Sequence, residues 1–206
     1  TIMSFIDDVG TEARRIGAVN TVIQREGKLC GYNTDIVGIR QALRGVVLRG
    51  KNVLILGAGG VARPVAYHVR ETGARALYVN RTKEKAEILA TEFGGEVVTI
   101  DDIGPENIQL IVNTTPVGMF PEVDAIPLQK EFLRSHHVVF DLVYNPLETR
   151  LTKDARAFGA SAISGLELFI APGAGPGRLW LGRDVPTEGL REKVLNFLLR
   201  QTRTSP

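Results

Sequence analysis

The sequence predicts an α/β protein with a doubly wound parallel sheet and part of a smaller α/β unit, on three observations. From residue 52 onward, apolar runs of strand length alternate with segments of helical periodicity, the order expected for βαβ units with right-handed crossovers. One of these runs, residues 53–56, is uninterrupted, as in a strand that helices bury on both faces. The glycine-rich residues 57–60 begin where that run stops, which predicts a turn at the carboxyl end of a central strand.

The remaining elements of this larger unit follow in a regular order. Strands are expected at 52–57, 75–80, 96–100, 109–113, 137–143 and 161–165, and helices at 60–72, 82–93 and 149–158. Pro64 falls in the first turn of its helix, where a missing amide hydrogen has little effect. A further helix is expected at residues 166–171. If this helix continues, we expect a kink at residues 172–177, which include two prolines and three glycines. An amphipathic helix is expected at 186–201.

The N-terminal part of the chain predicts the smaller unit. Helical spacing predicts a helix over residues 2–16. Two strands are expected at 17–23 and 28–35, joined by a hairpin turn at 24–27. A helix over 35–49 would then carry the chain to the larger sheet.

Asn20 and Asp35 are candidate ligands at the open ends of this hairpin. There, an amide and a carboxylate would both meet a small polyhydroxylated molecule. Asn and Asp at strand ends also make turns, and the two positions by themselves favour that simpler interpretation.

The glycine turn predicts a dinucleotide site. Gly57 and Gly59 would let the backbone turn tightly and approach a pyrophosphate, whose charge would meet free amide groups at the start of a helix. Ala62 occupies the third small position of this Rossmann-type pattern. Such turns also serve as plain strand-to-helix connections, so the pattern needs support from elsewhere in the chain.

That support comes from the end of the next expected strand. An NAD site usually has an acidic residue there, whereas this chain has Asn80, Arg81 and Thr82. Arg81 would stack on the adenine and bind a 2′-phosphate, with Thr82 and Lys85 as further donors, because a guanidinium presents a fork of donors to an anion. NADP is therefore favoured over NAD. The alternative is a capped helix start with solvated charges.

Two loops that follow apolar strands, residues 113–119 and 141–149, are also candidates. Both would lie at the carboxyl edge of the sheet, where open α/β sheets bind ligands. Either loop alone would be interpreted as a polar turn. Their presence on the edge already indicated by the glycine turn favours a role in binding.

Composition argues against several other classes of protein. Lys and Arg number 25 against 23 for Asp and Glu, so the charge gives no reason to expect a nucleic-acid or membrane partner. A single cysteine, Cys30, allows no internal disulfide, and the three histidines lack the spacing of metal ligands. There is neither a signal peptide nor an apolar run of about 18 residues, so a soluble, cytoplasmic protein is expected.

Taken together, the motifs resemble the shikimate dehydrogenase family over nearly the whole chain. The segments that carry the resemblance are 17–21, 31–35, 57–62, 80–82, 113–119, 141–149 and the chain from 165 onward. The resemblance implies an NADP-dependent oxidoreductase that interconverts 3-dehydroshikimate and shikimate, on the route to chorismate and the aromatic amino acids. Hydride would pass from NADPH to a ring ketone while an acid supplies a proton.

The resemblance also implies residue roles. Asp35 corresponds to the acidic half of the family's Lys-Asp catalytic pair, and the implied substrate ligands are Asn20, Asp35 and Tyr144. The implied cofactor contacts are Gly57, Ala58, Gly59, Gly60, Val61, Asn80, Arg81, Thr82 and Lys85, with Leu142 and Gly165 beside the nicotinamide. No metal is implied. Residues 1–36 would be a remnant of the substrate domain, 37–164 the NADP-binding Rossmann domain, and 165–206 helices that return toward the substrate domain.

Some features of the family pattern are not found in these 206 residues. The family's lysine would fall about two residues before Thr1, and the serines that hold the substrate would lie further upstream. Pro172 stands where the family usually has a glutamine that reaches the substrate. We therefore expect the chain to bind NADP but to reduce 3-dehydroshikimate at least about 100-fold more slowly than an intact enzyme. The exposed edge of the hairpin would allow pairing with another copy of the chain, so the sequence is compatible with either a monomer or a homodimer.

Besides a simple fragment of an ordinary enzyme, the sequence allows three other interpretations. Glutamyl-tRNA reductase has a similar nucleotide domain but explains neither Asn20, Asp35 nor the loop at 113–119. A quinate/shikimate dehydrogenase would tolerate NAD and quinate, and Arg81 argues modestly against it. A non-catalytic NADP-binding or sensing protein agrees with Pro172 and the missing lysine, but not with the intact Asn20 and Asp35.

Overall fold

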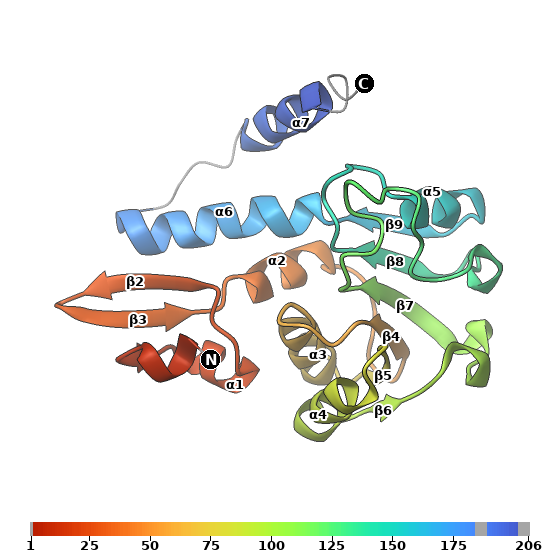
Figure 1. The fold of residues 1–206 in the computed structure, drawn as a ribbon, viewed down its shortest axis with the longest axis horizontal. Coiled ribbons are helices and arrows are strands. Elements are labelled where there is room, and N and C mark those ends of the chain that lie inside the picture. The colour runs from red at the N-terminus through yellow and green to blue at the C-terminus, as the bar shows by residue number, and fades with distance from the viewer. Residues whose placement is uncertain (1, 184–188, 202–206) are drawn as a thin grey trace.

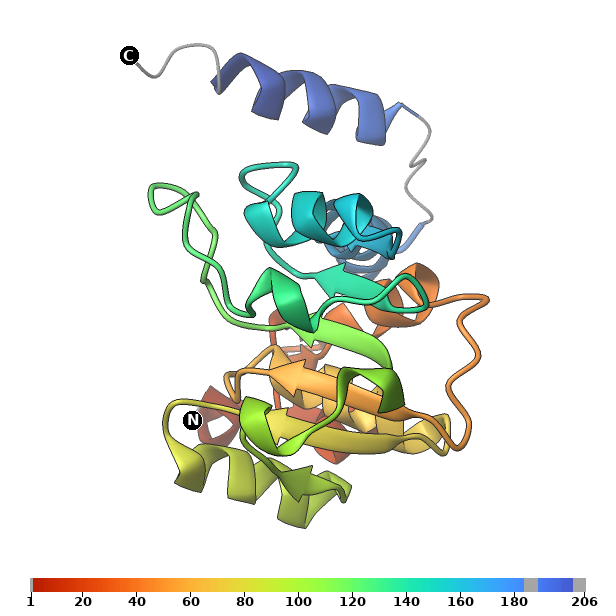
Figure 2. The same cartoon turned by 90° about the vertical axis from the view of Figure 1, so that its right-hand side faces the viewer.

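The structure is a computed structural model that describes residues 2–183 and 189–201, and it contains two sheets with helices around them (Figure 1). The larger sheet has six parallel strands in the order β6-β5-β4-β7-β8-β9. They are β4 (Asn52–Leu56), β5 (Arg75–Val79), β6 (Glu96–Val97), β7 (Ile108–Asn113), β8 (Val138–Asp141) and β9 (Ser161–Ser164). Figure 2 shows these strands side by side, with the loop after β7 projecting beyond the edge of the sheet.

The strand order reverses at the centre of this sheet. β5 and β6 lie on one side of β4, whereas β7, β8 and β9 lie on the other. The crevice beyond the carboxyl ends of β4 and β7 is therefore the position at which open parallel sheets bind ligands. The predicted doubly wound α/β fold is confirmed.

Helices cover both faces of the large sheet. They are α2 (Asp35–Ala42), α3 (Ala62–Glu71), α4 (Lys83–Phe93) and α5 (Arg150–Ala157), with short 3₁₀ helices η2 (Ile100–Asp102), η3 (Pro105–Asn107) and η4 (Lys130–Phe132). Val53 and Ile55 of β4 pack in the core under α2, α3 and α4, and Leu54 and Leu56 pack in a second core with α5 and η4. All four side chains are almost fully buried, as the uninterrupted apolar run predicts.

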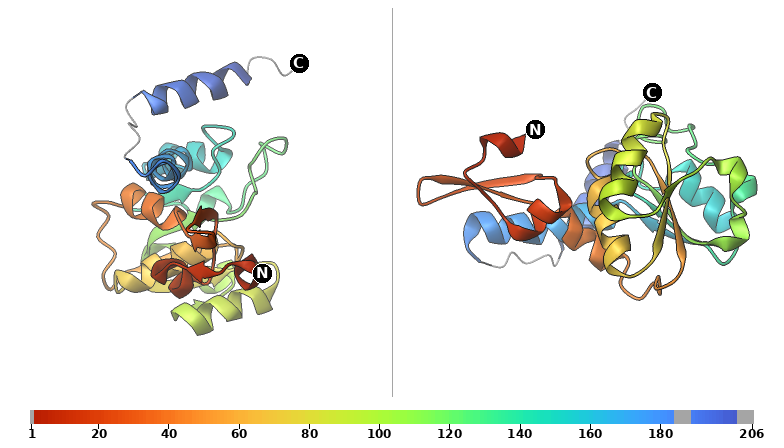
Figure 3. Two further views of the ribbon diagram at one scale, coloured as in Figure 1. Left: turned by 90° about the vertical axis from the view of Figure 1, so that its left-hand side faces the viewer. Right: turned by 90° about the horizontal axis from the view of Figure 1, so that it is seen from below.

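The smaller sheet has three strands and stands beside the larger one, with α6 running along it (Figure 3). Its elements are η1 (Ile2–Phe5), β1 (Asp8–Val9), α1 (Thr11–Ile16), β2 (Thr21–Arg25) and β3 (Lys28–Tyr32). β3 is central, parallel to β1 and antiparallel to β2. The hairpin turn has two residues, Glu26 and Gly27, with φ of 51° and 78°, rather than the four expected. Two positive φ angles are typical of the tight turns that join such strands.

The predicted helix over residues 2–16 is wrong except at its end. Only α1 is α-helical there, and residues 8–9 form a strand instead. Two hydrogen bonds explain the strand, since the amide of Gly10 donates to the carbonyl of Gly31 (2.9 Å) and Asp7 accepts from the amide of Leu29 (2.7 Å). Pairing with β3 therefore overrides the local helical spacing.

Glycines account for two other differences in element length. The predicted strand at 17–23 begins only at Thr21 because Gly17 ends α1 in a left-handed conformation, with φ of 68°. The predicted helix at 35–49 ends at Ala42, shortly before Gly45, whose φ of 95° is not helical. In the large sheet, β6 is shorter than the strand expected at 96–100, and the other boundaries agree within two residues.

Helix α6 (Leu166–Leu181) continues through residues 172–177 as one helix, so the segment does not interrupt it. Figure 1 shows α6 as a single coil above α2 and the small sheet, so the expected kink is not seen. Tertiary packing explains the difference, because it routinely overrides local propensity. A Cβ added at Gly38 of α2 would lie 2.9 Å from Cδ1 and 3.2 Å from Cα of Leu168, so the two helices pack backbone to backbone.

The last helix, α7 (Leu190–Gln201), agrees with the predicted amphipathic helix, although residues 186–188 of that prediction lie outside the described residues. Arg191 of α7 forms an ion pair with Glu167 of α6 at 2.5 Å. Among the described helices, none has both the length and the apolar character needed to cross a membrane. The same residues contain no cluster of His, Cys, Asp or Glu suited to a metal ion.

His137, in the connection before β8, predicts a pH-dependent part of the stability. Burial lowers the pKa of this side chain from its usual 6.5, and the hydrogen bond of Nε2 with the carbonyl of Pro105 (2.8 Å) opposes that shift. Nδ1 accepts from the amide of Arg134 at 3.1 Å. As pH falls below 6.5, the unfolded chain takes up this proton first, so the stability is present above 6.5 and is lost toward the lower folded pKa. We expect the free energy of unfolding of His137→Gln to fall less steeply than that of the wild type between these values. Urea titrations at a series of pH values measure these free energies. An equal dependence on pH in the two proteins would contradict the prediction.

Candidate active site

The glycine turn lies directly after β4, at the reversal in strand order. Gly57 has φ of 105°, and a Cβ there would lie 2.6 Å from Oγ1 of Thr114 and 2.8 Å from Cγ2 of Thr115. Both the backbone conformation and the close approach of the loop after β7 therefore require glycine at this position. Gly59 and Gly60 differ, since a Cβ at either would have no neighbour within 4 Å.

A cleft of about 500 Å³, the first cleft, opens at this turn. It is lined by Gly57, Ala58 and Gly59, by Asn80, Arg81, Thr82 and Lys85 after β5, and by Thr114, Thr115, Pro116 and Val117 after β7. Seven of the eleven cofactor contacts predicted from sequence thus lie around one cavity. Gly60 lines neither this cleft nor the second one described below.

Arg81 and Lys85 carry positive charge into the first cleft. Arg81 is exposed, and among the residues that the structure describes neither side chain has an ion-pair partner, whereas Lys83 lies 3.5 Å from Glu87. Thr82 is the N-cap of α4, yet its side chain makes no capping hydrogen bond. The bend is held instead by Asn80, whose amide donates to the carbonyl of Thr82 at 2.7 Å. This arrangement does not agree with a capped helix start, and it leaves cations available for a phosphate.

A larger cleft of about 890 Å³, the second cleft, separates the small sheet from the loops after β7 and β8. Its lining includes Asn20, Thr34, Asp35, Val61, Met119, Leu142, Val143, Tyr144, Gly165, Leu168 and Trp180. All three predicted substrate ligands are therefore brought to one cavity. Thr114, Thr115 and Pro116 line both clefts and form their common wall.

Asn20 is oriented by its neighbours. Its Oδ1 accepts from the amide of Thr34 (2.9 Å) and lies 3.1 Å from the hydroxyls of both Thr34 and Thr21. With the carbonyl oxygen occupied in this way, the amide nitrogen is left as the donor toward Asp35 and the cleft. The two ends of the hairpin are thus joined through Asn20.

Asp35 is the first residue of α2 and is largely enclosed. Burial raises the pKa of its carboxyl above the ordinary 3.8, and a side-chain hydrogen bond with Asn20 opposes that rise. Ionisation at neutral pH therefore works against folding.

This shift predicts that Asp35→Asn stabilises the folded chain. Because the folded pKa is raised, the stabilising contribution of Asp35 is fully present only below 3.8 and is lost as pH rises through the folded pKa. The variant should therefore melt at a higher temperature than the wild type at pH 7, and the difference should shrink toward zero in acid. A variant less stable than the wild type at pH 7 in thermal unfolding would contradict this.

Leu142 and Gly165 lie together in the lining of the second cleft. A Cβ at Gly165 would be 2.2 Å from the carbonyl oxygen of Leu142 and 2.7 Å from that of Val143, so only glycine allows this approach. Tyr144 is 41% exposed at the rim. Pro172 lies in α6, but its side chain is not among those that the structure describes.

Some lining residues were not predicted as individual site residues. Thr114 and Thr115 belong to a loop that the sequence singled out, and their position directly after a buried strand was the available signal. Trp180 is the single tryptophan of the chain, and nothing in its local sequence points to the cleft, because α6 carries it there from a distant segment.

Known proteins match both the sequence and this fold. The family model for shikimate/quinate 5-dehydrogenase matches residues 40–115. The shikimate dehydrogenase (NADP⁺) of Symbiobacterium thermophilum is 40% identical over 96% of this chain and 72% of its own length. That of Methanocaldococcus jannaschii is also 40% identical, over 97% of this chain and 74% of its own length.

A solved structure agrees with these relatives. Shikimate 5-dehydrogenase of Thermus thermophilus, crystallised with NADP(H) and shikimate, superposes with a TM-score of 0.83 at 41% identity, over 93% of this chain and 72% of that one. The agreement extends over both sheets, because the match covers nearly all of this chain. The chain belongs to the shikimate dehydrogenase family.

Proposed function

We propose that this chain binds NADP in the first cleft and shikimate or 3-dehydroshikimate in the second, as an NADP-dependent oxidoreductase that acts on a CH-OH group. The observation that carries this proposal is the common wall of Thr114, Thr115 and Pro116, which places the glycine turn and the Asn20-Asp35 pair on adjoining cavities. Membership of the shikimate dehydrogenase family supports the same reaction.

The first cleft suits NADP in charge and in shape. The open space at Gly59 would admit a pyrophosphate against the backbone, and Arg81, Thr82 and Lys85 would hold a 2′-phosphate. Leu142 and Gly165 would lie beside the nicotinamide. When bound as NADPH, the cofactor supplies the hydride.

On the substrate side, Asn20 and Asp35 would hold hydroxyl groups of a ring. The amide nitrogen of Asn20 is a donor, and the carboxyl of Asp35 accepts a hydroxyl proton when it is ionised. Because burial raises its pKa, Asp35 is closer to neutrality than an ordinary aspartate, which suits a group that exchanges a proton with a substrate. Tyr144 would contact the same ring from the loop after β8.

The division of the chain follows from these roles. We propose residues 1–36 as part of the substrate domain, 37–164 as the NADP-binding domain, and 165–206 as the segment that returns to the substrate side. The single buried cysteine, Cys30, agrees with a reducing, cytoplasmic location.

Ligand binding and turnover of the 206-residue chain test the proposal. In fluorescence titrations, NADP should bind at least about tenfold more tightly than NAD, since the 2′-phosphate adds charge-assisted hydrogen bonds. Oxidation of shikimate, followed by NADPH formation, should be at least about 100-fold slower than that of an intact relative, because the family's catalytic lysine is not in these 206 residues.

The outcomes also separate the rival functions. Equal affinity for NAD and NADP, with turnover of quinate, would favour a quinate/shikimate dehydrogenase. Tight NADP binding with neither binding nor oxidation of shikimate would favour a non-catalytic NADP-binding protein. A normal turnover rate would show that the proposed dependence on the lysine is wrong.

A further inference from the structure

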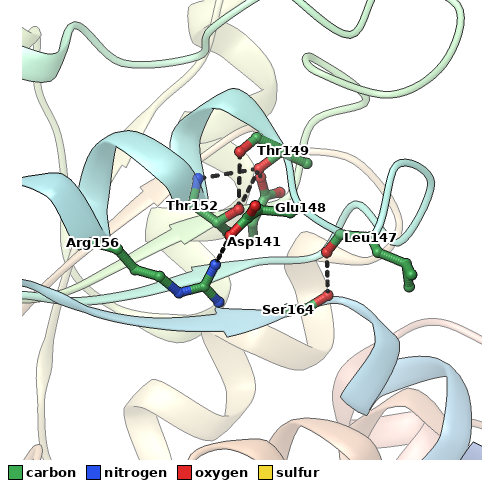
Figure 4. A network of polar contacts seen from close by, with 7 residues as sticks. All are labelled: Asp141, Leu147, Glu148, Thr149, Thr152, Arg156 and Ser164. Atoms are coloured by element: carbon green, nitrogen blue, oxygen red, sulfur yellow. Dashed lines mark hydrogen bonds and ion pairs between the residues drawn. The ribbon is translucent and has the colours of Figure 1, made fainter. Parts of the chain in front are cut away.

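Asp141, at the carboxyl end of β8, is a fully buried carboxyl group that lines neither cleft. Three groups donate hydrogen bonds to it: the side-chain amide of Asn113 (2.9 Å) and the amide of Val143 (3.1 Å) to Oδ1, and the hydroxyl of Thr149 (2.6 Å) to Oδ2. Figure 4 shows Asp141 beside Thr149 at the start of α5. One carboxylate thus binds the ends of β7 and β8 and the first turn of a helix.

Through Asn113, the carboxylate determines the shape of the wall that the two clefts share. The side chain of Asn113 accepts from the amide (3.0 Å) and the hydroxyl (2.6 Å) of Thr115, and its backbone carbonyl accepts from the amide of Leu142 (3.0 Å). If Asn113 turned its amide over, the contacts with both Asp141 and Thr115 would be lost. The donor side of Asn113 is therefore held by Asp141 and, at a longer distance of 3.3 Å, by the carbonyl of Val117, and the acceptor side positions the wall.

Through Thr149, the carboxylate also holds the far end of the loop that carries Val143. The hydroxyl of Thr149 accepts from the amide of Thr152 (3.2 Å) and so caps α5. The same loop is tied to β9 by the hydroxyl of Ser164, which donates to the carbonyl of Leu147 at 3.1 Å (Figure 4). Both ends of the segment that runs past Gly165 are therefore held in place.

A buried carboxyl group contributes little net stability to a fold. Desolvation penalises its charged form, and apolar groups of similar volume often serve stability as well or better. Burial also raises the pKa of Asp141, and its three hydrogen bonds oppose that rise. A group of this kind is better explained by the backbone arrangement that it enforces.

We propose that Asp141 is a positioning residue: through Asn113, Val143 and Thr149 it holds the wall against which the nicotinamide half of NADP binds. This inference rests on the proposed NADP site. It places the effect of Asp141 on one half of the cofactor, because none of the hydrogen bonds described for this network involves Arg81, Thr82 or Lys85 at the other half.

The test compares two probes, NADPH and its fragment 2′,5′-ADP, which lacks the nicotinamide. In Asp141→Asn, the new NH₂ group would replace an acceptor, so it would face either the two N–H donors of Asn113 and Val143 or the hydroxyl of Thr149. NADPH should then bind about tenfold more weakly, whereas the affinity for the fragment should change by less than about twofold. Thr149→Val should show the same selectivity with a smaller loss, and Thr149→Ser should restore wild-type binding because it keeps the hydroxyl. Asp102→Asn is the matched control, since Asp102 is exposed and accepts from a hydroxyl at 2.6 Å.

Isothermal titration gives both affinities without the need for turnover. Equal losses for the two probes, or no loss for NADPH, would overturn the positioning role. If Asp141→Asn failed to fold, Thr149→Val and Thr149→Ser would decide the matter by the same ratio. A wild-type chain that binds neither probe would instead overturn the NADP site itself, and the inference with it.

Discussion

Replacement of Arg81 by alanine is expected to weaken NADP binding about 30-fold and to change NAD binding by less than about twofold. The guanidinium lies in the first cleft without an ion-pair partner among the described residues, so its charge is available to a 2′-phosphate. A hydrogen bond to a charged group contributes about 2 kcal/mol, which corresponds to this factor. Because NAD lacks the 2′-phosphate, the ratio of the two affinities is the informative quantity, and calorimetric titration measures it.

Lys83→Ala is the matched control for this prediction. Lys83 is two residues away and carries the same charge, but it lies 3.5 Å from Glu87 and does not line the cleft. Its removal should alter the affinities for NADP and NAD equally and only slightly. If Arg81→Ala and Lys83→Ala had the same effect, the positive charge would act through the general field of α4, and the 2′-phosphate contact would be wrong.

The second large effect is expected at Gly57. Gly57→Ala should destabilise the chain by about 3 kcal/mol, because the new Cβ would enter a backbone conformation that L residues avoid and would collide with the loop after β7. For a chain of this size, that loss corresponds to a fall of roughly 10 °C in the melting temperature. Differential scanning calorimetry measures it.

Two other glycines separate the causes. Gly50 has φ of 70° with open space around it, so Gly50→Ala should cost only about 1 kcal/mol, the conformational part alone. Gly59 has open space and no positive φ, so Gly59→Ala should leave the melting temperature nearly unchanged and should weaken NADP binding. If Gly57→Ala and Gly50→Ala had equal effects, the predicted collision with Thr114 and Thr115 would be absent.

Most of the large sheet could be predicted from sequence because its strands are short apolar runs and its helices follow with regular spacing. The first cleft follows from the same logic, since the ends of consecutive parallel strands meet at one edge. Arg81 could be predicted as a residue of this cleft because it stands at the position where a different residue type would indicate NAD. Such signals are local, and each lies within a few residues of the element that carries it.

The features that could not be predicted from the sequence depend on contacts between distant segments. Residues 8–9 are a strand only because β3 is beside them, and α6 continues through two prolines while it packs on Gly38. Trp180 reaches the second cleft by the length of α6. The role of Asp141 was likewise hidden, because its partners Asn113 and Thr149 come from separate loops.

If the proposed function is right, the common wall of Thr114, Thr115 and Pro116 would make the two binding equilibria interdependent. Any displacement of this wall by a molecule in one cleft alters the lining of the other. By thermodynamic reciprocity, the factor by which NADP changes the affinity for shikimate equals the factor by which shikimate changes the affinity for NADP. The segment between β7 and Met119 would therefore couple the two affinities by the same factor in both directions, and it also forms the place where the two clefts meet.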